Sequence, residues 1–170
     1  MRSKATLKPT FRRLSEKECR ALLARHHVGR IAFVVRGRAD IEPISYGFAG
    51  DHIVIRTAPG TKLQALRRNP WVAFEVDEVA GPFDWRSVVV HATVYRTDPV
   101  GSESDLRAYR RAVAQLRAFA PAALRPGDPA PFRDVVLRLY ISEIAGRAAS
   151  TRGRSGADKR MSGVRRRTPP

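Results

Sequence analysis

The amino-acid sequence predicts a mainly β fold with peripheral helices, an antiparallel barrel or sheet. Three observations predict it: six segments carry strand patterns, most connections between them have hairpin length, and only three segments show helical features. A doubly wound fold is excluded, because its strands alternate with helices throughout. The 170 residues suit one domain that can bury a substantial core.

Three helices are expected. The first follows Ser15, whose S-x-x-E spacing to Glu18 forms a capping box. A second, short helix has Thr61 as its expected N-cap and ends near Arg68. The third covers residues 102–120 and carries apolar side chains on one face.

Strand patterns occupy most of the remaining chain. The second predicted strand contains Pro43, which removes a ladder donor and is therefore expected at an edge, at a bulge or beside a ligand. Turn signals separate the strands. The predicted strands cover residues 30–36, 40–48, 52–57, 71–79, 85–97 and 135–144.

The formal net charge of +16 is concentrated at the two ends of the chain. Residues 1–13 contribute +5 and residues 147–170 contribute +7. The composition predicts a flexible basic arm at 1–13, a folded domain at 14–146 and a disordered basic tail at 147–170. Charge placed in such flanks indicates weak binding of nucleic acid through the tail rather than the function of the folded domain.

Several functional classes are excluded by composition. No apolar run approaches the ~20 residues that cross a bilayer, so no membrane association is expected. The single cysteine, Cys19, excludes an internal disulfide and a multi-cysteine metal site, and the cytoplasm is the simplest compartment. The four histidines have no spacing to a serine or carboxylate that is typical of a catalytic triad, so no catalytic or metal-binding residue is predicted.

The segment I-R-T-A-P-G-T-K, residues 55–62, predicts an anion site. Arg56 and Thr57 end a strand, a Pro-Gly turn follows, and Thr61 and Lys62 begin a helix whose free N–H groups favour an anion. The arginine fork, the lysine charge and the hydroxyl groups would hold a phosphate. A capped helix with solvent-facing charges is the alternative, and the single glycine excludes a Walker A loop.

Acidic and aromatic side chains give two weaker signals. Glu75 and Asp77 would share one face of a strand, where a solvated face explains them better than a glycosidase-like pair. Trp71, Phe83 and Trp85 fit packing in the core or at an edge, with stacking on a planar ligand as the alternative.

Six sequence blocks occur in a fixed order between Leu14 and Tyr95. They read L-S-E-K-E-C-R-A-L-L, G-R-I-A-F-V, P-I-S-Y-G-F, I-V-I-R-T-A-P-G-T-K-L, V-A-F-E-V-D and W-R-S-V-V-V-H-A-T-V-Y. With these blocks the chain resembles the FMN-binding split-barrel proteins related to pyridoxamine 5'-phosphate oxidase, and within them the nitroimidazole-resistance-like branch. About half of the chain carries the resemblance.

The resemblance implies a homodimer of split β-barrels with flavin at the interface. It implies three groups of cofactor contacts. The FMN phosphate would be bound by Arg56, Thr57, Thr61 and Lys62. The isoalloxazine would be lined by Pro43, Ile44, Ser45 and Tyr46, with Phe33 near the ring. The partner chain would contribute Trp85, Ser87 and Val88.

The function that the resemblance implies is an FMN-dependent oxidoreductase, which transfers a hydride through flavin N5 to an unidentified small molecule. The residues that hold pyridoxal in true pyridoxamine phosphate oxidases are not recognisable. A deazaflavin coenzyme is an alternative cofactor, and some members of the superfamily bind haem. The alternative function is a flavin- or deazaflavin-binding module with little turnover, for storage, sensing or protection. Nucleic-acid binding through the basic tail is a third interpretation, without a supporting motif.

Overall fold

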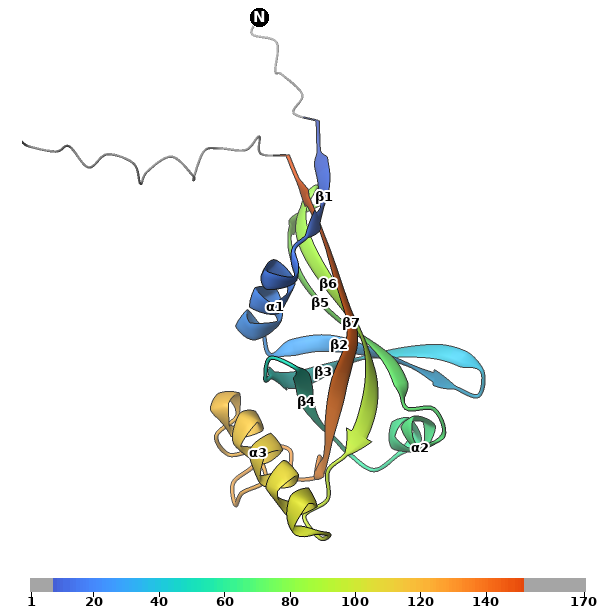
Figure 1. The fold of residues 1–170 in the computed structure, drawn as a ribbon, viewed down its shortest axis with the longest axis vertical. Coiled ribbons are helices and arrows are strands. Elements are labelled where there is room, and N and C mark those ends of the chain that lie inside the picture. The colour runs from blue at the N-terminus through green and yellow to red at the C-terminus, as the bar shows by residue number, and fades with distance from the viewer. Residues whose placement is uncertain (1–7, 152–170) are drawn as a thin grey trace, which may run out of the picture.

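The computed structural model describes residues 8–151, which form seven strands and three helices (Figure 1). Within this range, no helix is both long and apolar enough to cross a bilayer. The predicted disorder of the basic tail concerns mostly residues outside this range. The elements are β1 (Thr10–Leu14), α1 (Glu16–Arg25), β2 (Val28–Val35), β3 (Arg38–Phe48), β4 (His52–Thr57), α2 (Thr61–Arg68), β5 (Trp71–Gly81), β6 (Asp84–Arg96), α3 (Glu103–Phe119) and β7 (Val135–Ser150).

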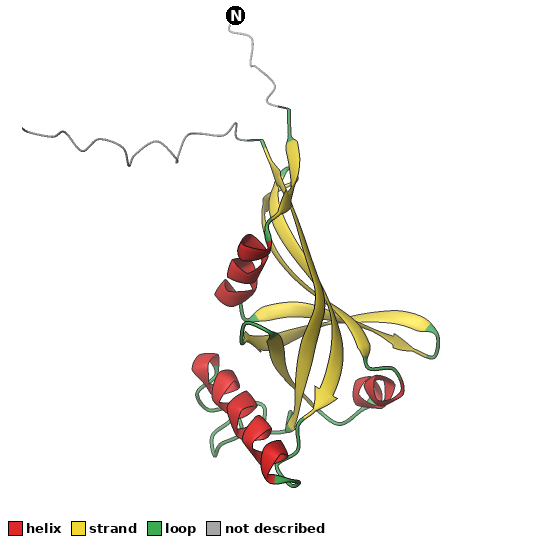
Figure 2. Cartoon of the chain, in the orientation of Figure 1, coloured by secondary structure: helices red, strands yellow, loops and turns green. Residues whose placement is uncertain are grey.

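The strands form one antiparallel sheet that closes on itself. Its order is β1-β7-β4-β3-β2-β5-β6, and an additional β7–β6 pairing closes a six-stranded barrel. β7 pairs with β4 along its first six residues and with β1 along its last five residues. All three helices lie outside the barrel (Figure 2). The predicted fold class, an antiparallel split β-barrel with peripheral helices, is confirmed.

Strand alternation explains the main core. One face of each barrel strand places apolar side chains inside, as with Ile31, Phe74 and Val90, which are fully buried. A second, smaller cluster lies between the outer face of β4 and α3, where Val54 packs with Val113 and Leu116. α3 therefore covers one outer face of the barrel, whereas the faces of β2, β3 and β5 carry exposed apolar side chains.

The strand β1 was not predicted, and it moves both expected domain boundaries. Residues 10–13, expected in a flexible arm, pair with β7, and β7 itself extends to Ser150 rather than ending near Ile144. The basic composition of β1 concealed it, because four of its five residues are exposed and no apolar alternation is present. Within the described range, the folded unit thus begins near Thr10.

The predicted helices are confirmed, with one correction at a helix end. α1 has the Ser15–Glu18 capping box, with each side chain bonded to the other residue's backbone N–H. The N-cap of α2 is Gly60 rather than Thr61, which is the first helical residue, and no side chain caps this helix. The α2 N-terminus therefore keeps its N–H groups available.

Candidate functional site

The start of α2 is the centre of the predicted anion site. The first N–H that bonds within this helix is that of Gln64, to the Gly60 carbonyl at 3.1 Å. Among residues 8–151, the N–H groups of Thr61, Lys62 and Leu63 have no hydrogen-bond partner. Such groups at the positive end of a helix dipole are suited to an anion.

Lys62 is the cation that the structure places at this helix start. Its side chain is only 13% exposed, and its Nζ lies 2.6 Å from Oε2 of Glu42 on β3. The Glu42 side chain is 42% exposed and can turn to solvent when an anion replaces it. Thr57 ends β4 next to the turn and is buried, while Thr61 is exposed. The lysine, the helix N–H groups and the exposed Thr61 hydroxyl fit a phosphate.

Arg56 is not brought into this cluster. Neighbouring residues on a strand point to opposite faces, so Arg56 points to the α3 side, as does Val54, while Thr57 faces inward. The guanidinium forms a two-pronged ion pair with the Asp128 carboxylate in the loop after α3, with Nη2 2.9 Å from Oδ1. Both side chains are nearly buried. Arg56 therefore holds the loop after α3 against β4, and the structure does not place it at the phosphate site that the resemblance implies.

The Arg56–Asp128 pair predicts an acid-dependent stability. The Arg56 hydrogen bonds, followed by those from the N–H groups of Ala130 and Leu124, hold the pKa of Asp128 far below its usual range. A lowered carboxylate pKa contributes stability that is present above the unfolded-state value of about 4 and is lost as pH falls toward the folded-state value. We expect Asp128→Asn to lower the free energy of unfolding most above pH 5, with a shrinking difference below pH 4.

Urea unfolding between pH 3 and pH 7 measures this difference. The matched control is Asp98→Asn, because Asp98 lies 4.0 Å from Arg96 in an exposed pair that is expected to contribute little. A difference for Asp128→Asn that stays constant down to pH 3 would contradict the role assigned to the carboxylate charge.

β3 divides its predicted site residues between two faces. Pro43 and Ser45 are exposed, whereas Ile44 and Tyr46 are buried inside the barrel. The Tyr46 hydroxyl donates a hydrogen bond to the Leu23 carbonyl at 2.7 Å, and burial raises the pKa of this tyrosine. Only the backbone of the two buried residues could therefore contact a ligand outside the barrel.

The position of Pro43 agrees with the reason given for it. It pairs with Arg30 on β2 but has no partner on β4, which pairs with β3 only from Tyr46 to Phe48. Proline thus lies where the strand has one neighbour, so no ladder bond to β4 is lost at this position. Pro43 and Ser45 leave an exposed strip of β3 along which a planar group could lie.

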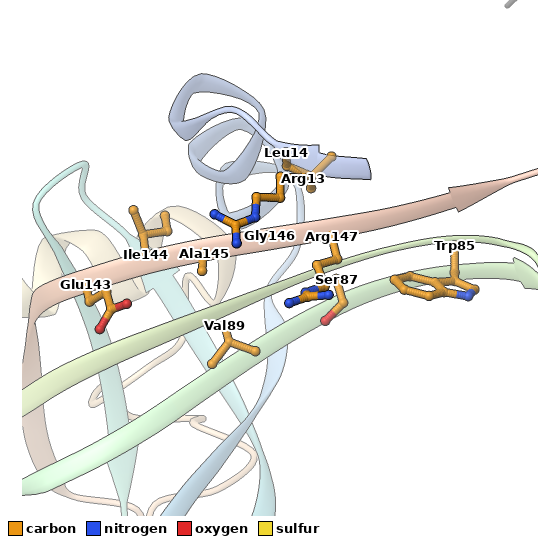
Figure 3. A pocket seen from close by; sticks show the side chains of 10 residues that line it. All are labelled: Arg13, Leu14, Trp85, Ser87, Val89, Glu143, Ile144, Ala145, Gly146 and Arg147. Atoms are coloured by element: carbon orange, nitrogen blue, oxygen red, sulfur yellow. The ribbon is translucent and has the colours of Figure 1, made fainter. Parts of the chain in front are cut away.

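The residues expected to contact a partner's flavin are likewise divided. Trp85 and Ser87 line a groove of about 550 Å³ on the outer face of β6 and β7 (Figure 3). Val88 is fully buried in the barrel. The Ser87 hydroxyl donates to Oε1 of Glu75 at 2.8 Å. Of Val88, only the backbone could therefore contact a ligand outside the barrel. That Trp85, Ser87 and Val88 contact the flavin of a partner stays a prediction.

The remaining polar candidates have structural partners. Nη1 of Arg30 lies 3.0 Å from Oε2 of Glu75 and 2.7 Å from Oδ1 of Asp77. These two carboxylates are therefore explained by their ion pairs with Arg30. Nε2 of His26 lies 2.8 Å from Oε1 of Glu78, and the ring of His27 stacks on that of Phe119 with centroids 4.8 Å apart. Within residues 8–151, no group of three histidine, cysteine or acidic side chains could hold a metal ion.

A family model described as pyridoxamine 5'-phosphate oxidase matches residues 15–148, most of the chain. The chain belongs to the pyridoxamine 5'-phosphate oxidase family. An uncharacterized protein of Rhizobium meliloti (strain 1021), RA0666, is 33% identical over 77 residues. That match covers 45% of this chain and 51% of the relative, so the chain spans about half the length of the curated relative it matches.

Solved structures share the fold of this family member. An FAD-binding protein of Mesorhizobium loti has a TM-score of 0.64 and 27% identity, over 81% of this chain and 96% of that chain. An FAD binding protein of Mycobacterium smegmatis has a TM-score of 0.56 and 27% identity, over 80% and 98%. A Bacteroides thetaiotaomicron protein, provisionally described as a 5-nitroimidazole antibiotic resistance protein, has a TM-score of 0.63 and 15% identity, over 84% and 89%, and shares the fold alone. The family resemblance inferred from the six sequence blocks is confirmed.

Two features of the site were not identified from the sequence. Glu42 and Asp128 pair with the predicted phosphate-binding cations, although they lie 20 and 72 residues away from them in the chain. The pairing of Arg13 with Arg147 across β1 and β7 was missed together with β1 itself. Only a sequence signal for β1 could have indicated that Arg13 and Arg147 lie opposite each other.

Proposed function

We propose that this protein binds a flavin and acts as a flavin-dependent oxidoreductase on a small molecule. The observation that carries the proposal is the α2 start, where free N–H groups lie together with Lys62 and the exposed hydroxyl of Thr61. Membership of the family and the FAD-binding proteins among the structural neighbours support it.

In this proposal the chain binds and orients the cofactor. Lys62 and the N–H groups of α2 hold the phosphate, and Thr61 adds a hydroxyl donor. The exposed strip at Pro43 and Ser45 supports the ring from one side. The bound flavin supplies the two-electron chemistry, so the protein needs no acid–base pair of its own at this position. FMN is the form we propose, since the cluster described here offers a single phosphate site.

We also propose a homodimer, in which the outer faces of β2, β3 and β5 meet those of a second copy. Val34, Ile41 and Trp71 form an outer apolar patch on these three strands and are 41%, 60% and 61% exposed. An exposed apolar patch of this kind is typical of an interaction surface. Association through it would shield a ring that lies along β3 from water.

Replacing Lys62 tests the flavin proposal. Lys62→Ala is expected to weaken FMN binding by about tenfold or more, because a charge-assisted hydrogen bond to the phosphate is lost. The measurement is a titration followed by the visible flavin absorption, with FMN, FAD and a deazaflavin compared, and sedimentation of the same samples gives the oligomeric state.

Arg67→Ala is the matched control, because Arg67 is an exposed cation on the last turn of the same helix. It is expected to bind FMN as the unchanged protein does. Purified protein that binds none of the three cofactors would overturn the proposal. Binding that Lys62→Ala leaves unchanged would remove the phosphate site from α2.

A further inference from the structure

A cavity of about 600 Å³ lies where the end of β6 and the first half of β7 meet the first turns of α3. The two strands contribute outward-facing side chains, among them Tyr95 and Arg138, and α3 contributes Asp105 and Ala108. Tyr95 and Arg138 are directly opposite each other in the antiparallel register. The volume lies within the range of small-molecule sites, about 300–1,000 Å³.

Arg138 is a cation of this cavity whose guanidinium lacks an acceptor. Its Nε is buried, and among residues 8–151 the guanidinium has neither a hydrogen-bond acceptor nor an ion-pair partner. Arg56, which also lies on the α3 side of the barrel, differs, because it is paired with Asp128. A buried donor without an acceptor is rare in folded proteins and requires an explanation. A ligand that brings an acceptor to Arg138 would supply one.

Two acids act on the surroundings of Arg138, and both are bonded to other groups. Oδ1 of Asp51 lies 2.6 Å from Nδ1 of His52, and this hydrogen bond, with a smaller contribution from the charge of Arg138, lowers the pKa of Asp51. Oδ2 of Asp105 accepts hydrogen bonds from the hydroxyl and the N–H of Ser102, at 2.6 and 3.0 Å. The cavity therefore combines one arginine without an ion pair and one carboxylate, Asp105, in its lining.

One wall of the cavity is aromatic. Cζ of Arg138 lies 4.7 Å from the centroid of the Tyr140 ring, and the Tyr95 ring meets that of Tyr140 edge-on with centroids 5.2 Å apart. Tyr95 is 54% exposed, so a further ring can pack against it. The donors of a guanidinium lie in its plane, and contact of one face with a ring therefore leaves them free for an anion.

We propose that this cavity binds an aromatic monocarboxylate, with the carboxylate at Arg138 and the ring against Tyr95. The fork of an arginine matches the two oxygens of a carboxylate. A phosphate dianion fits less well, because the Asp105 carboxylate in the lining repels a second negative charge. The other cation of the lining, Arg96, is exposed and already lies 4.0 Å from Asp98.

This site goes beyond the proposed flavin function and does not rest on it. No residue that lines the cavity belongs to α2, β2, β3 or β5, which carry the proposed phosphate site, the exposed strip and the outer apolar patch. The residues expected at a partner's flavin, Trp85 to Val88, lie at the start of β6, whereas Thr93 and Tyr95 lie near its end. A ligand of this cavity therefore leaves the proposed flavin contacts free.

Calorimetric titration of the full chain with benzoate tests the proposal, and saturable binding is expected. Benzamide has the same ring without the charge and is expected to bind about tenfold more weakly or worse. Acetate, which lacks the ring, and phenyl phosphate, which carries more negative charge, are also expected to bind more weakly than benzoate. Equal binding of benzoate and benzamide would overturn the proposal, because Arg138 would then make no contact with the carboxylate.

The variants separate Arg138 from general charge. Arg138→Met keeps an unbranched stem without the charge, and it is expected to weaken benzoate binding by about tenfold or more. Arg138→Lys keeps the charge without the fork and should lose less. Tyr95→Ala is expected to weaken binding by about threefold to tenfold, whereas Tyr95→Phe keeps the ring and the affinity.

Arg133→Met is the matched control, because Arg133 is an exposed arginine that also lies over a ring, that of Phe132, and does not line the cavity. It is expected to bind benzoate as the unchanged protein does. Thermal unfolding of each variant verifies that it folds. Benzoate binding that Arg138→Met leaves unchanged, or the absence of saturable binding to the unchanged protein, would overturn the proposal.

Two further titrations test the charge argument and the separation from the flavin. Asp105→Asn is expected to raise the affinity for phenyl phosphate by a larger factor than that for benzoate, because the repulsion that it removes acts on more charge. An equal factor for both would overturn the preference for a monoanion. Unchanged affinity for benzoate at saturating FMN supports a separate site, and competition between the two ligands would overturn it.

Discussion

Truncating Phe74 to alanine is expected to lower the free energy of unfolding by about 3–5 kcal/mol. Phe74 is fully buried on β5, opposite Ile31 of β2 and Val90 of β6, and its ring meets that of Tyr46 edge-on with centroids 4.9 Å apart. Removing the ring leaves a cavity that the closed barrel can fill only in part, because strands on both sides are fixed by their ladders. Urea unfolding monitored by circular dichroism gives the difference.

Phe132→Ala is the control for this prediction. It makes the same chemical change in the loop before β7, where the ring is 62% exposed, and it is expected to alter the free energy of unfolding by less than about 0.5 kcal/mol. Similar losses for the two variants would contradict the assignment of Phe74 to the barrel core.

The effect of Phe74 reaches the proposed flavin site through β3. Tyr46 packs against Phe74 on the inner face, and Ser45, its neighbour, belongs to the exposed strip on the outer face. A collapse of the inner face would shift this strip. We therefore expect Phe74→Ala to weaken flavin binding at temperatures where it is still folded.

Local signals in the sequence were sufficient for most of the fold. The capping box at Ser15 depends on residues three positions apart, and α1 begins where this pair predicts. The apolar face of residues 102–120 predicted α3, and the structure adds a capping box between Ser102 and Asp105 at its start. Strands such as β2 and β5 alternate in burial, and this alternation is visible in the sequence as a period of two. β1 carries no such signal, since its stability comes from pairing with a strand more than 130 residues away.

The candidate site was predictable only in part, for a related reason. Thr57 ends β4 and Lys62 lies in the first turn of α2, so one short turn joins them and the sequence could predict this part of the site. Arg56 shows the limit: strand alternation separates it from Thr57, and its partner Asp128 lies in a loop whose position no local pattern predicts. The groove at Trp85 required the register of three strands, which short-range patterns do not contain.

Gly29 and Phe74 form the contact for which we expect the clearest energetic coupling. A Cβ built on Gly29 would lie 2.4 Å from Cζ of Phe74 and 2.8 Å from the Glu75 carbonyl oxygen. Gly29→Ala alone is therefore expected to cost about 1–3 kcal/mol through overpacking. In the double variant with Phe74→Ala the ring is absent and the methyl group partly fills the cavity. The free energy of unfolding lost by the double variant should therefore be clearly smaller than the sum of the two single losses.

The double-mutant cycle separates the two causes of strain at Gly29. The part of the loss that disappears when Phe74 is alanine belongs to the ring, and the part that persists belongs to the backbone oxygen, which no side-chain change removes. A coupling of at least about 1 kcal/mol is expected. Gly81→Ala is the control, because a Cβ there meets no atom within 4 Å. If the two losses were strictly additive, the Glu75 carbonyl oxygen would account for the whole loss at Gly29. Glycine would then be required by the close approach of β2 to β5 and not by the Phe74 ring.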